Sequence, residues 1–324
     1  MSIKDAYVRF TEPKTKALHA TIGVFDRPFG FEIGYSSGSR ETPERGRMSQ
    51  VIFPGERDLG AMITFQMPKT SKWNMLKIDA GMFNGTGPTA VDFDYQKDFI
   101  GRIRIDKTSK NEKFVLGLGT SVYSGGWRQG TGKVYMMKAD SAGMQAFEMD
   151  KDTALYGAIA GRSYGGADVQ LSYVFPFGLT TLRAEYIAGV QPGSSSAVAS
   201  LNVQPTVDNY KRNFNGAYFY FIQNIGKSKH QFVLKYDWFD PNTEVAGDEI
   251  GKSTLAFAGT TYAKTGKADM KYSTLGLGWT YRWDANLKIV AYYDMVTNET
   301  SANVSKVSKD LSDNVFTLRV QYKF

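Results

Sequence analysis

Hydrophobic and polar residues alternate with a period of two along most of the chain. Near its start, Val8 and Phe10 fall on one face of their segment, whereas Tyr7 and Arg9 fall on the other. The last residues, 316–324, repeat the pattern. Because the side chains of a β-strand leave opposite faces in turn, this pattern predicts strands. No segment shows a comparable helical period.

The alternation predicts thirteen strands, most of them about ten residues long, which is the length that a tilted strand needs to cross a bilayer. Their ranges are 4–11, 17–26, 57–67, 74–84, 98–107, 113–123, 165–175, 179–190, 213–225, 230–239, 270–283, 286–297 and 313–324. Short connections such as 284–285 alternate with long ones such as 27–56 and 124–164. Short turns at one rim and long loops at the other are typical of an outer-membrane barrel.

The two faces of the predicted strands differ in a way that favours a membrane protein. The apolar face often ends in aromatic residues, as at Tyr236 and Trp238 or at Trp279 and Tyr281, and such residues suit the membrane–water interface. The opposite face is polar in nearly every strand. We therefore predict an all-β fold, a transmembrane antiparallel β-barrel with an apolar exterior and a polar lumen. The alternative is a soluble all-β protein, which would bury its apolar face instead.

Composition narrows the chemistry further. The 324 residues include no Cys and only two His, so disulfides, thiolate metal sites and a cysteine nucleophile are excluded. His19 is predicted to face the lumen and His230 to lie beside a short turn, so we expect no catalytic residues. We also expect no cofactor, no metal and no nucleic-acid partner. Acidic residues in 237–249 could bind Ca²⁺ on the outer rim, although they lack EF-hand spacing.

The strand count is odd, whereas bacterial single-chain barrels have an even number of strands. The predicted strand 4–11 leads into a short turn, so at least one strand should precede it. We expect that a signal peptide and N-terminal strands precede Met1, and three further strands would give sixteen. The alternative is one more strand at 153–160, which would break the alternation of loop lengths.

Several motifs resemble the phosphate-selective porin O/P family, in the versions found in Bacteroidota. They are DRPFGFE at 26–32, FPGERDLG at 53–60, GLTTLRAEY at 178–186, KYDWFDPN at 235–242 and NVFTLRVQYKF at 314–324. The resemblance covers the whole chain. It implies a sixteen-stranded, homotrimeric channel in an outer membrane of the Gram-negative type, with anion selectivity in the characterised members.

With three strands preceding, residues 27–56 become the third long loop, which in trimeric porins folds into the barrel and narrows it. We predict that Arg40, Arg45 and Arg47 in this candidate constriction loop bind anions, because a guanidinium donates two parallel hydrogen bonds to an oxyanion. The same loop carries nearly as many acids, so the alternative is that its arginines form salt bridges that hold the loop to the wall.

Two further arginines, Arg102 and Arg104, lie two residues apart on one inward face and are predicted to extend the anion path. Their alternative role is pairing with carboxylates on neighbouring strands. The other arginines that the alternation places on the lumen wall are Arg9, Arg183, Arg282 and Arg319.

The sequence thus predicts a single barrel domain over 1–324 that acts as a porin rather than an enzyme. It would let small, phosphate-type anions diffuse passively through a water-filled lumen, with small inorganic anions and outer-membrane lipid as partners. One alternative is a general porin without selectivity. The other is a barrel that serves as a surface receptor or as part of an extracellular complex.

Overall fold

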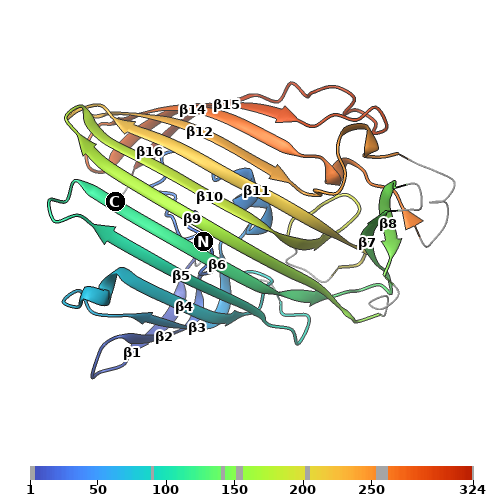
Figure 1. Ribbon diagram of the computed structural model, residues 1–324, viewed down its shortest axis with the longest axis horizontal. Helices are drawn as coiled ribbons and strands as arrows, with labels where there is room; N and C mark the ends of the chain where they lie inside the picture. The colour runs from blue at the N-terminus through green and yellow to red at the C-terminus, as the bar shows by residue number, and fades with distance from the viewer. Residues whose placement is uncertain are drawn as a thin grey trace.

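The computed structural model describes residues 4–88, 91–139, 143–150, 156–200, 205–252 and 262–322. Sixteen strands form one sheet, and thirteen of them follow one another as the wall of a barrel (Figure 1). The wall strands are β1 (Ala6–Thr11), β2 (Leu18–Asp26), β3 (Arg57–Gln66), β4 (Leu76–Phe83), β5 (Asp98–Thr108), β6 (Phe114–Arg128), β9 (Ile159–Phe175), β10 (Gly178–Gly193), β11 (Asn209–Asn224), β12 (His230–Asp240), β14 (Tyr272–Arg282), β15 (Leu287–Asn298) and β16 (Val315–Tyr322).

Every pair of neighbours in the wall is antiparallel, with a continuous register such as Ala6↔Val24 between β1 and β2 and Leu287↔Tyr322 between β15 and β16. Each of the thirteen predicted segments is one of these strands. Short turns gather at one end of the barrel and long loops at the other (Figure 1). Among the described residues, no backbone pairing joins β1 to β16, so the path ends in two edges.

Three strands outside the wall were not predicted. β7 (Val134–Ala139) and β8 (Gln145–Met149) form a hairpin within the long connection between β6 and β9, and β13 (Tyr262–Ala263) pairs with β8. β7 also pairs in parallel with the start of β11. Of the strand considered at 153–160, residues 153–155 lie outside the described part, residues 156–158 are not in a strand, and the last two residues begin β9.

In the described residues, helical structure is limited to α1 (Arg47–Ile52) and the short 3-10 turns η1 (Lys72–Met75), η2 (Gly247–Glu249) and η4 (Lys267–Asp269). In the described part of the chain, no helix has the length and apolar character that a membrane crossing requires.

The wall has an apolar exterior and a polar interior. Ile22, Ile63 and Leu318 are among the many large apolar residues that point outward and are 45% or more exposed, with values of 54%, 53% and 66%. On the inner face, Asp79 and Glu185 are buried, with 4% and 2% exposure. This arrangement suits lipid outside the barrel and a hydrated lumen inside.

Candidate functional site

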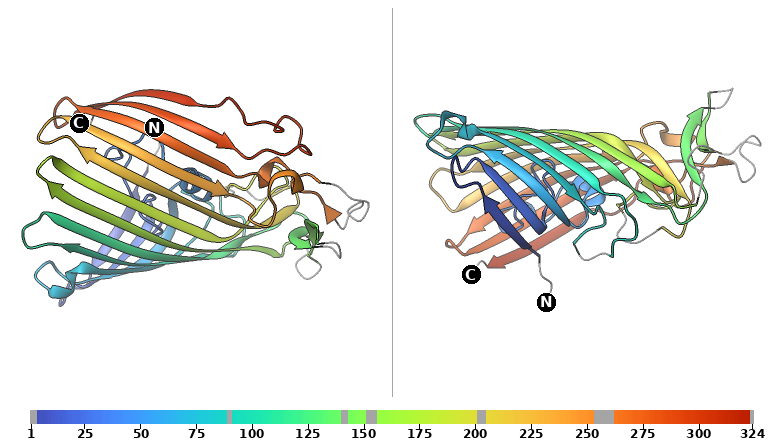
Figure 2. Two further views of the ribbon diagram at one scale, coloured as in Figure 1. Left: turned by 45° about the horizontal axis from the view of Figure 1, so that its top comes forward. Right: turned by 90° about the horizontal axis from the view of Figure 1, so that it is seen from below.

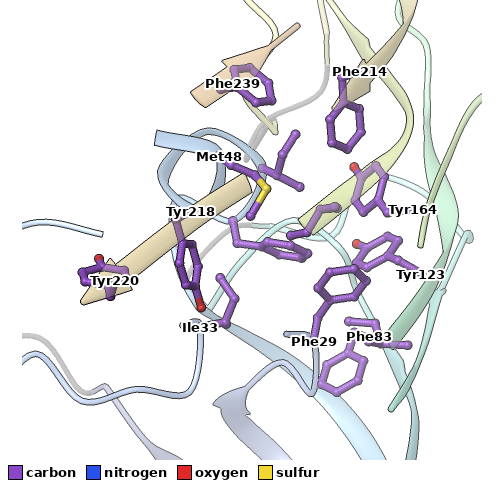
Figure 3. Close-up of a cluster of buried hydrophobic side chains, with 14 of the residues drawn as sticks. Phe29, Ile33, Met48, Phe83, Tyr123, Tyr164, Phe214, Tyr218, Tyr220 and Phe239 are labelled. Carbon is purple, nitrogen blue, oxygen red and sulfur yellow. The ribbon is translucent and has the colours of Figure 1, made fainter. Parts of the chain in front are cut away.

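Residues 27–56, here called the lumen loop, turn back between β2 and β3 into the interior of the barrel. Their short helix α1 lies inside the wall in the views of Figures 1 and 2. Phe29 and Phe53 of the loop pack together with ring centroids 5.0 Å apart, and both contact Tyr164 of β9. These rings belong to a buried cluster that the loop shares with β4, β5, β6, β9, β11 and β12 (Figure 3). Apolar packing therefore holds the loop inside an otherwise polar lumen.

Backbone groups of the loop also bind the wall directly. The N–H groups of Phe31 and Glu32 both donate to the Glu185 carboxylate of β10, at 3.0 and 3.2 Å, and the Gly30 N–H donates to the Ser121 hydroxyl at 3.0 Å. Gly30 has a φ of +59°, and a Cβ at this position would overlap the Glu185 carboxylate. A glycine is therefore required where the loop meets β10.

The loop is closed on itself by Glu32. Its carboxylate accepts the Gly46 N–H at 3.1 and 3.0 Å and the Tyr220 hydroxyl of β11 at 2.8 Å. Farther along the loop, Arg47 donates its backbone N–H to Asp237 of β12 at 3.1 Å. The loop is thus bound to strands β10, β11 and β12 and fills part of the lumen.

The three arginines predicted to bind anions in the loop have different environments. The Arg45 guanidinium is buried and donates to the Ser49 and Phe53 carbonyls at 3.3 and 3.2 Å, with Glu56 at 3.3 Å. These contacts match the alternative of internal pairing. Burial lowers the pKa of Arg45 from its ordinary value, and the charges of Glu56 and Glu32 oppose that shift.

Arg40 and Arg47 lie apart from these contacts. Arg40 is 7% exposed, and its Nε has no hydrogen-bond partner. The Arg47 side chain is exposed, with its guanidinium 4.7 Å from the ring centroid of Tyr272. The three arginines thus differ in burial, since Arg40 and Arg45 are buried and Arg47 is exposed.

The predicted pair on β5 is engaged by neighbours. Arg102 binds Asp168 of β9 at 2.8 Å and donates to the Gly30 carbonyl. Arg104 binds Asp106 at 2.7 Å and Gln170 at 3.1 Å. Both side chains face the lumen, as the alternation predicted. Arg102 also pairs with a carboxylate on another strand, which was the alternative, whereas the carboxylate partner of Arg104 lies on β5 itself.

The remaining predicted lumen arginines fall into two groups. Arg183 is ion-paired with Glu41 of the lumen loop at 2.7 Å. Arg9, Arg282 and Arg319 have no carboxylate within 4.0 Å among the described residues. Arg9 donates to Thr21 at 3.3 Å, and Arg319 donates to the Pro43 carbonyl at 3.0 Å.

A hollow of about 370 Å³ lies between the base of the lumen loop and the inner face of β1–β5. Its charged lining comes from four bases and three acids, namely Arg9, Arg27, Lys77, Arg102, Asp5, Asp26 and Asp79. The acids have partners: Asp5 and Asp26 contact Arg57 at 2.7 and 3.4 Å, and Asp79 contacts Lys77 at 3.0 Å. Arg9 has no such partner, so the lining keeps a positive balance.

The sequence prediction missed the aromatic residues that frame the arginines. Phe31 lies 5.1 Å from Tyr35, and the guanidinium groups of Arg104 and Arg183 lie 5.5 and 5.2 Å from the Phe31 centroid. Burial raises the pKa of the Tyr35 hydroxyl, and the nearby Glu41 charge adds to this shift. The D-R-P-F-G-F-E motif contains Phe31, but alternation could not show that the loop places it between two strands.

In the part of the chain that the structure describes, no three His, Cys, Asp or Glu side chains form a group that could hold a metal ion. In the acidic segment 237–249, Asp237 faces Lys235 at 2.9 Å inside the lumen, and Asp240 accepts the Asn242 N–H at 3.2 Å. The two histidines are also separate: His19 pairs with Thr11 at 3.0 Å, and His230 accepts the Trp279 indole N–H at 3.1 Å.

Comparison with known proteins shows similarity in structure only. No protein-family model matches the chain, and no curated protein sequence matches it. OmpT of Vibrio cholerae, expressed in the outer membrane, is similar over 99% of this chain and 81% of its own, with 9% identity and a TM-score of 0.51. The outer membrane channel DcaP of Acinetobacter baumannii and the anion-selective porin from Comamonas acidovorans each match 94% of this chain and 71% of their own, at 10% identity, with TM-scores of 0.47 and 0.40.

The similarity to the Vibrio cholerae outer-membrane protein confirms the predicted fold class. The fold and the apolar exterior are those of a barrel of the Gram-negative outer membrane, which was the predicted location. The more specific resemblance, to the phosphate-selective porin O/P family, stays a prediction.

Proposed function

We propose that this protein is a passive outer-membrane channel that favours small anions. Its passage would run between the lumen loop, acting as the constriction, and the inner face of β1–β5. The observation that carries this proposal is the charged hollow at that place, in which every acid has a basic partner and Arg9 has no acidic one among the described residues. Bases on a lumen wall raise the local concentration of anions, and rings of Arg and Lys are a known means of anion selection.

The anion-binding roles predicted for individual arginines are revised in this proposal. Arg9 and Arg102 would contact the permeating anion because they line the hollow. Arg45 would support the loop instead, since its guanidinium is occupied by loop carbonyls and Glu56. Phosphate-type solutes remain the proposed class, because an arginine without a carboxylate partner offers an oxyanion paired donors.

Two alternatives follow from specific observations. The near balance of four bases and three acids in the hollow favours a general porin with little selectivity. The β7–β8 hairpin and β13 at the long-loop rim instead favour a surface receptor or complex partner. We propose no catalytic role, because the two histidines lie apart and each is paired with a non-acidic side chain.

Assembly is also part of the proposal. Among the described strands, none pairs with the outer edge of β1 or of β16, and a hydrocarbon environment cannot satisfy unpaired backbone groups. We therefore propose that further antiparallel strands cover both edges in the membrane, and that the complete barrel forms a homotrimer. Slow amide hydrogen exchange along Ala6–Thr11 in native outer membranes would agree with covered edges, whereas rapid exchange would contradict them.

Planar-bilayer recordings of the purified protein separate these functions. Discrete channel openings with a reversal potential that shows greater chloride than potassium permeability are expected. Equal permeabilities would favour the general porin, and no conductance at all would favour the receptor. If phosphate is a solute, adding inorganic phosphate should reduce the chloride current in a saturable way, because both anions would compete for the same hollow.

A further inference from the structure

We propose that a small divalent oxyanion, such as inorganic phosphate, fastens the tip of the lumen loop to the wall within a basic cluster formed by Arg40, Arg282, Lys288 and Arg319. This site lies against β14–β16, whereas the proposed passage lies against β1–β5. The anion would be a resident structural ligand, so the inference does not depend on which solutes pass through the channel.

Strand register gathers three of the four bases. Arg282 of β14 is the direct cross-strand partner of Lys288 of β15, and Lys288 in turn is the partner of Gln321 of β16. Arg319 lies two residues before Gln321 on the same face, opposite Val290. Because directly opposed side chains are about 5 Å apart at Cβ, the ends of these long side chains can converge on one point.

The lumen loop brings the fourth base to the same place. The Lys288 Nζ donates to the carbonyls of Gly38 and Arg40 at 3.0 and 2.8 Å. Arg319 donates to the Pro43 carbonyl at 3.0 Å, and Gln321 donates to the Ser37 carbonyl at 3.5 Å. Donors of β15 and β16 therefore hold four carbonyls of residues 37–43, while Glu41 of the same segment pairs with Arg183 of β10.

Among the described residues, none of the four bases has a carboxylate within 4.0 Å, although Glu32 and Glu41 line a small cavity with Arg40. The charges that act most strongly on the Lys288 ammonium are those of Arg282, Glu41, Arg319 and Arg40, of which three are positive. The single acid, Glu41, already receives both terminal nitrogens of Arg183, at 2.7 and 3.1 Å, and the Tyr35 hydroxyl at 3.1 Å. Gathering like charges against a buried loop is unfavourable unless an anion compensates them.

Donors remain available for that anion. A lysine ammonium has three N–H donors, and Lys288 uses two of them for the loop carbonyls. Arg40 and Lys288 are each 7% exposed, and the Nε of Arg40 is buried without a partner. Buried polar groups are normally hydrogen-bonded, so the Nε of Arg40, which has no partner among the described residues while the Arg40 carbonyl is held by Lys288, indicates a ligand. A tetrahedral oxyanion offers several acceptor oxygens and two charges, which fits such a set of donors.

The test measures phosphate binding and loop protection in the purified protein in lipid-free detergent. Inorganic phosphate should raise the thermal unfolding midpoint in a saturable way, and chloride at equal ionic strength should not, because a ligand that binds only the folded state stabilises it. Calorimetry should give one phosphate per chain. Phosphate should also slow amide hydrogen exchange in residues 36–43 while leaving the β7–β8 hairpin unchanged.

Variants locate the site. Arg282→Gln and Arg319→Gln should each weaken the apparent phosphate affinity by about tenfold, the usual effect of losing one charge-assisted hydrogen bond. Lys110→Gln, which removes the same charge from the short turn between β5 and β6, should leave the affinity unchanged. If a cluster variant does not fold, phosphate calorimetry and amide hydrogen exchange on the wild-type protein still test the proposal. The proposal is overturned if wild-type protein shows no saturable phosphate effect, or if both cluster variants retain full affinity. The chloride-to-potassium permeability test is separate from these readouts.

Discussion

Arg183 of β10 binds Glu41 of the lumen loop through both terminal nitrogens, at 2.7 and 3.1 Å. The same guanidinium lies 5.2 Å from the Phe31 centroid and 4.6 Å from the Tyr35 centroid. Both partners of the ion pair are shielded, with side chains 14% and 7% exposed. One wall residue thus joins the loop to β10 by charge and by aromatic contact.

Replacing Glu41 by Gln should destabilise the loop strongly. It would leave the shielded Arg183 charge without its carboxylate, and breaking a buried ion pair costs about 3–5 kcal/mol. Denaturant unfolding followed by loop proteolysis would measure the loss. As a control, Glu148→Gln breaks the pair with Lys138, whose side chain is 67% exposed. Exposed pairs contribute about 0–1 kcal/mol, so equal losses in the two variants would refute the anchoring role.

Gly30→Ala should displace the loop from β10. The new methyl group would overlap the Glu185 carboxylate, and an alanine at a φ of +59° adds backbone strain of about 1–3 kcal/mol. The N–H groups of Phe31 and Glu32 would then lose their acceptor. Increased protease cleavage within 27–56 is the expected measurement. Gly34→Ala is the control, because a Cβ there has open space around it. Equal cleavage of both variants would contradict the prediction.

The wall was predictable because the membrane imposes one simple rule on its strands. Ile22, Ile63 and Leu318 face lipid and their neighbours face the lumen, so the period of two appears directly in the sequence. The rule does not apply beyond the wall. The β7–β8 hairpin is short and lies at the rim, and α1 has six residues without a side-chain N-cap. These elements are fixed by tertiary contacts that periodicity does not record.

The candidate site was predictable only in part, for a related reason. Alternation correctly placed Arg102 and Arg183 on the inner face, because the face that a side chain occupies depends only on its position along its own strand. It could not assign their partners, because Asp168 lies 66 residues from Arg102 and Glu41 lies 142 residues from Arg183. For Arg45 the partners are local carbonyls at Ser49 and Phe53, which depend on the turn geometry of α1 rather than on charge pattern.

Arg45→Ala should reduce stability without changing ion selectivity. The substitution would remove the charged donor from the Ser49 and Phe53 carbonyls and break the ion pair with Glu56, a loss of about 1–3 kcal/mol. Arg47→Ala is the matched control, since its exposed guanidinium lies over the Tyr272 ring, a contact that contributes about 0.5–1 kcal/mol. Thermal unfolding and bilayer reversal potentials would be measured on both variants. If Arg45→Ala changed ion selectivity and left thermal unfolding unaltered, the prediction would be wrong and Arg45 would be assigned to the anion path.

Arg9→Glu should lower the ratio of chloride to potassium permeability. Arg9 lines the hollow and has no carboxylate partner among the described residues, so its charge acts on the passage without compensation. Reversing it changes the lining from four bases and three acids to three bases and four acids. The reversal potential in a salt gradient should therefore shift toward the potassium equilibrium potential, with the shift reduced at high ionic strength because salt screens the exposed charge. Lys227→Glu makes the same charge change in the short turn between β11 and β12 and should leave the potential unchanged. An unaltered potential in Arg9→Glu would show that ions pass elsewhere in the lumen.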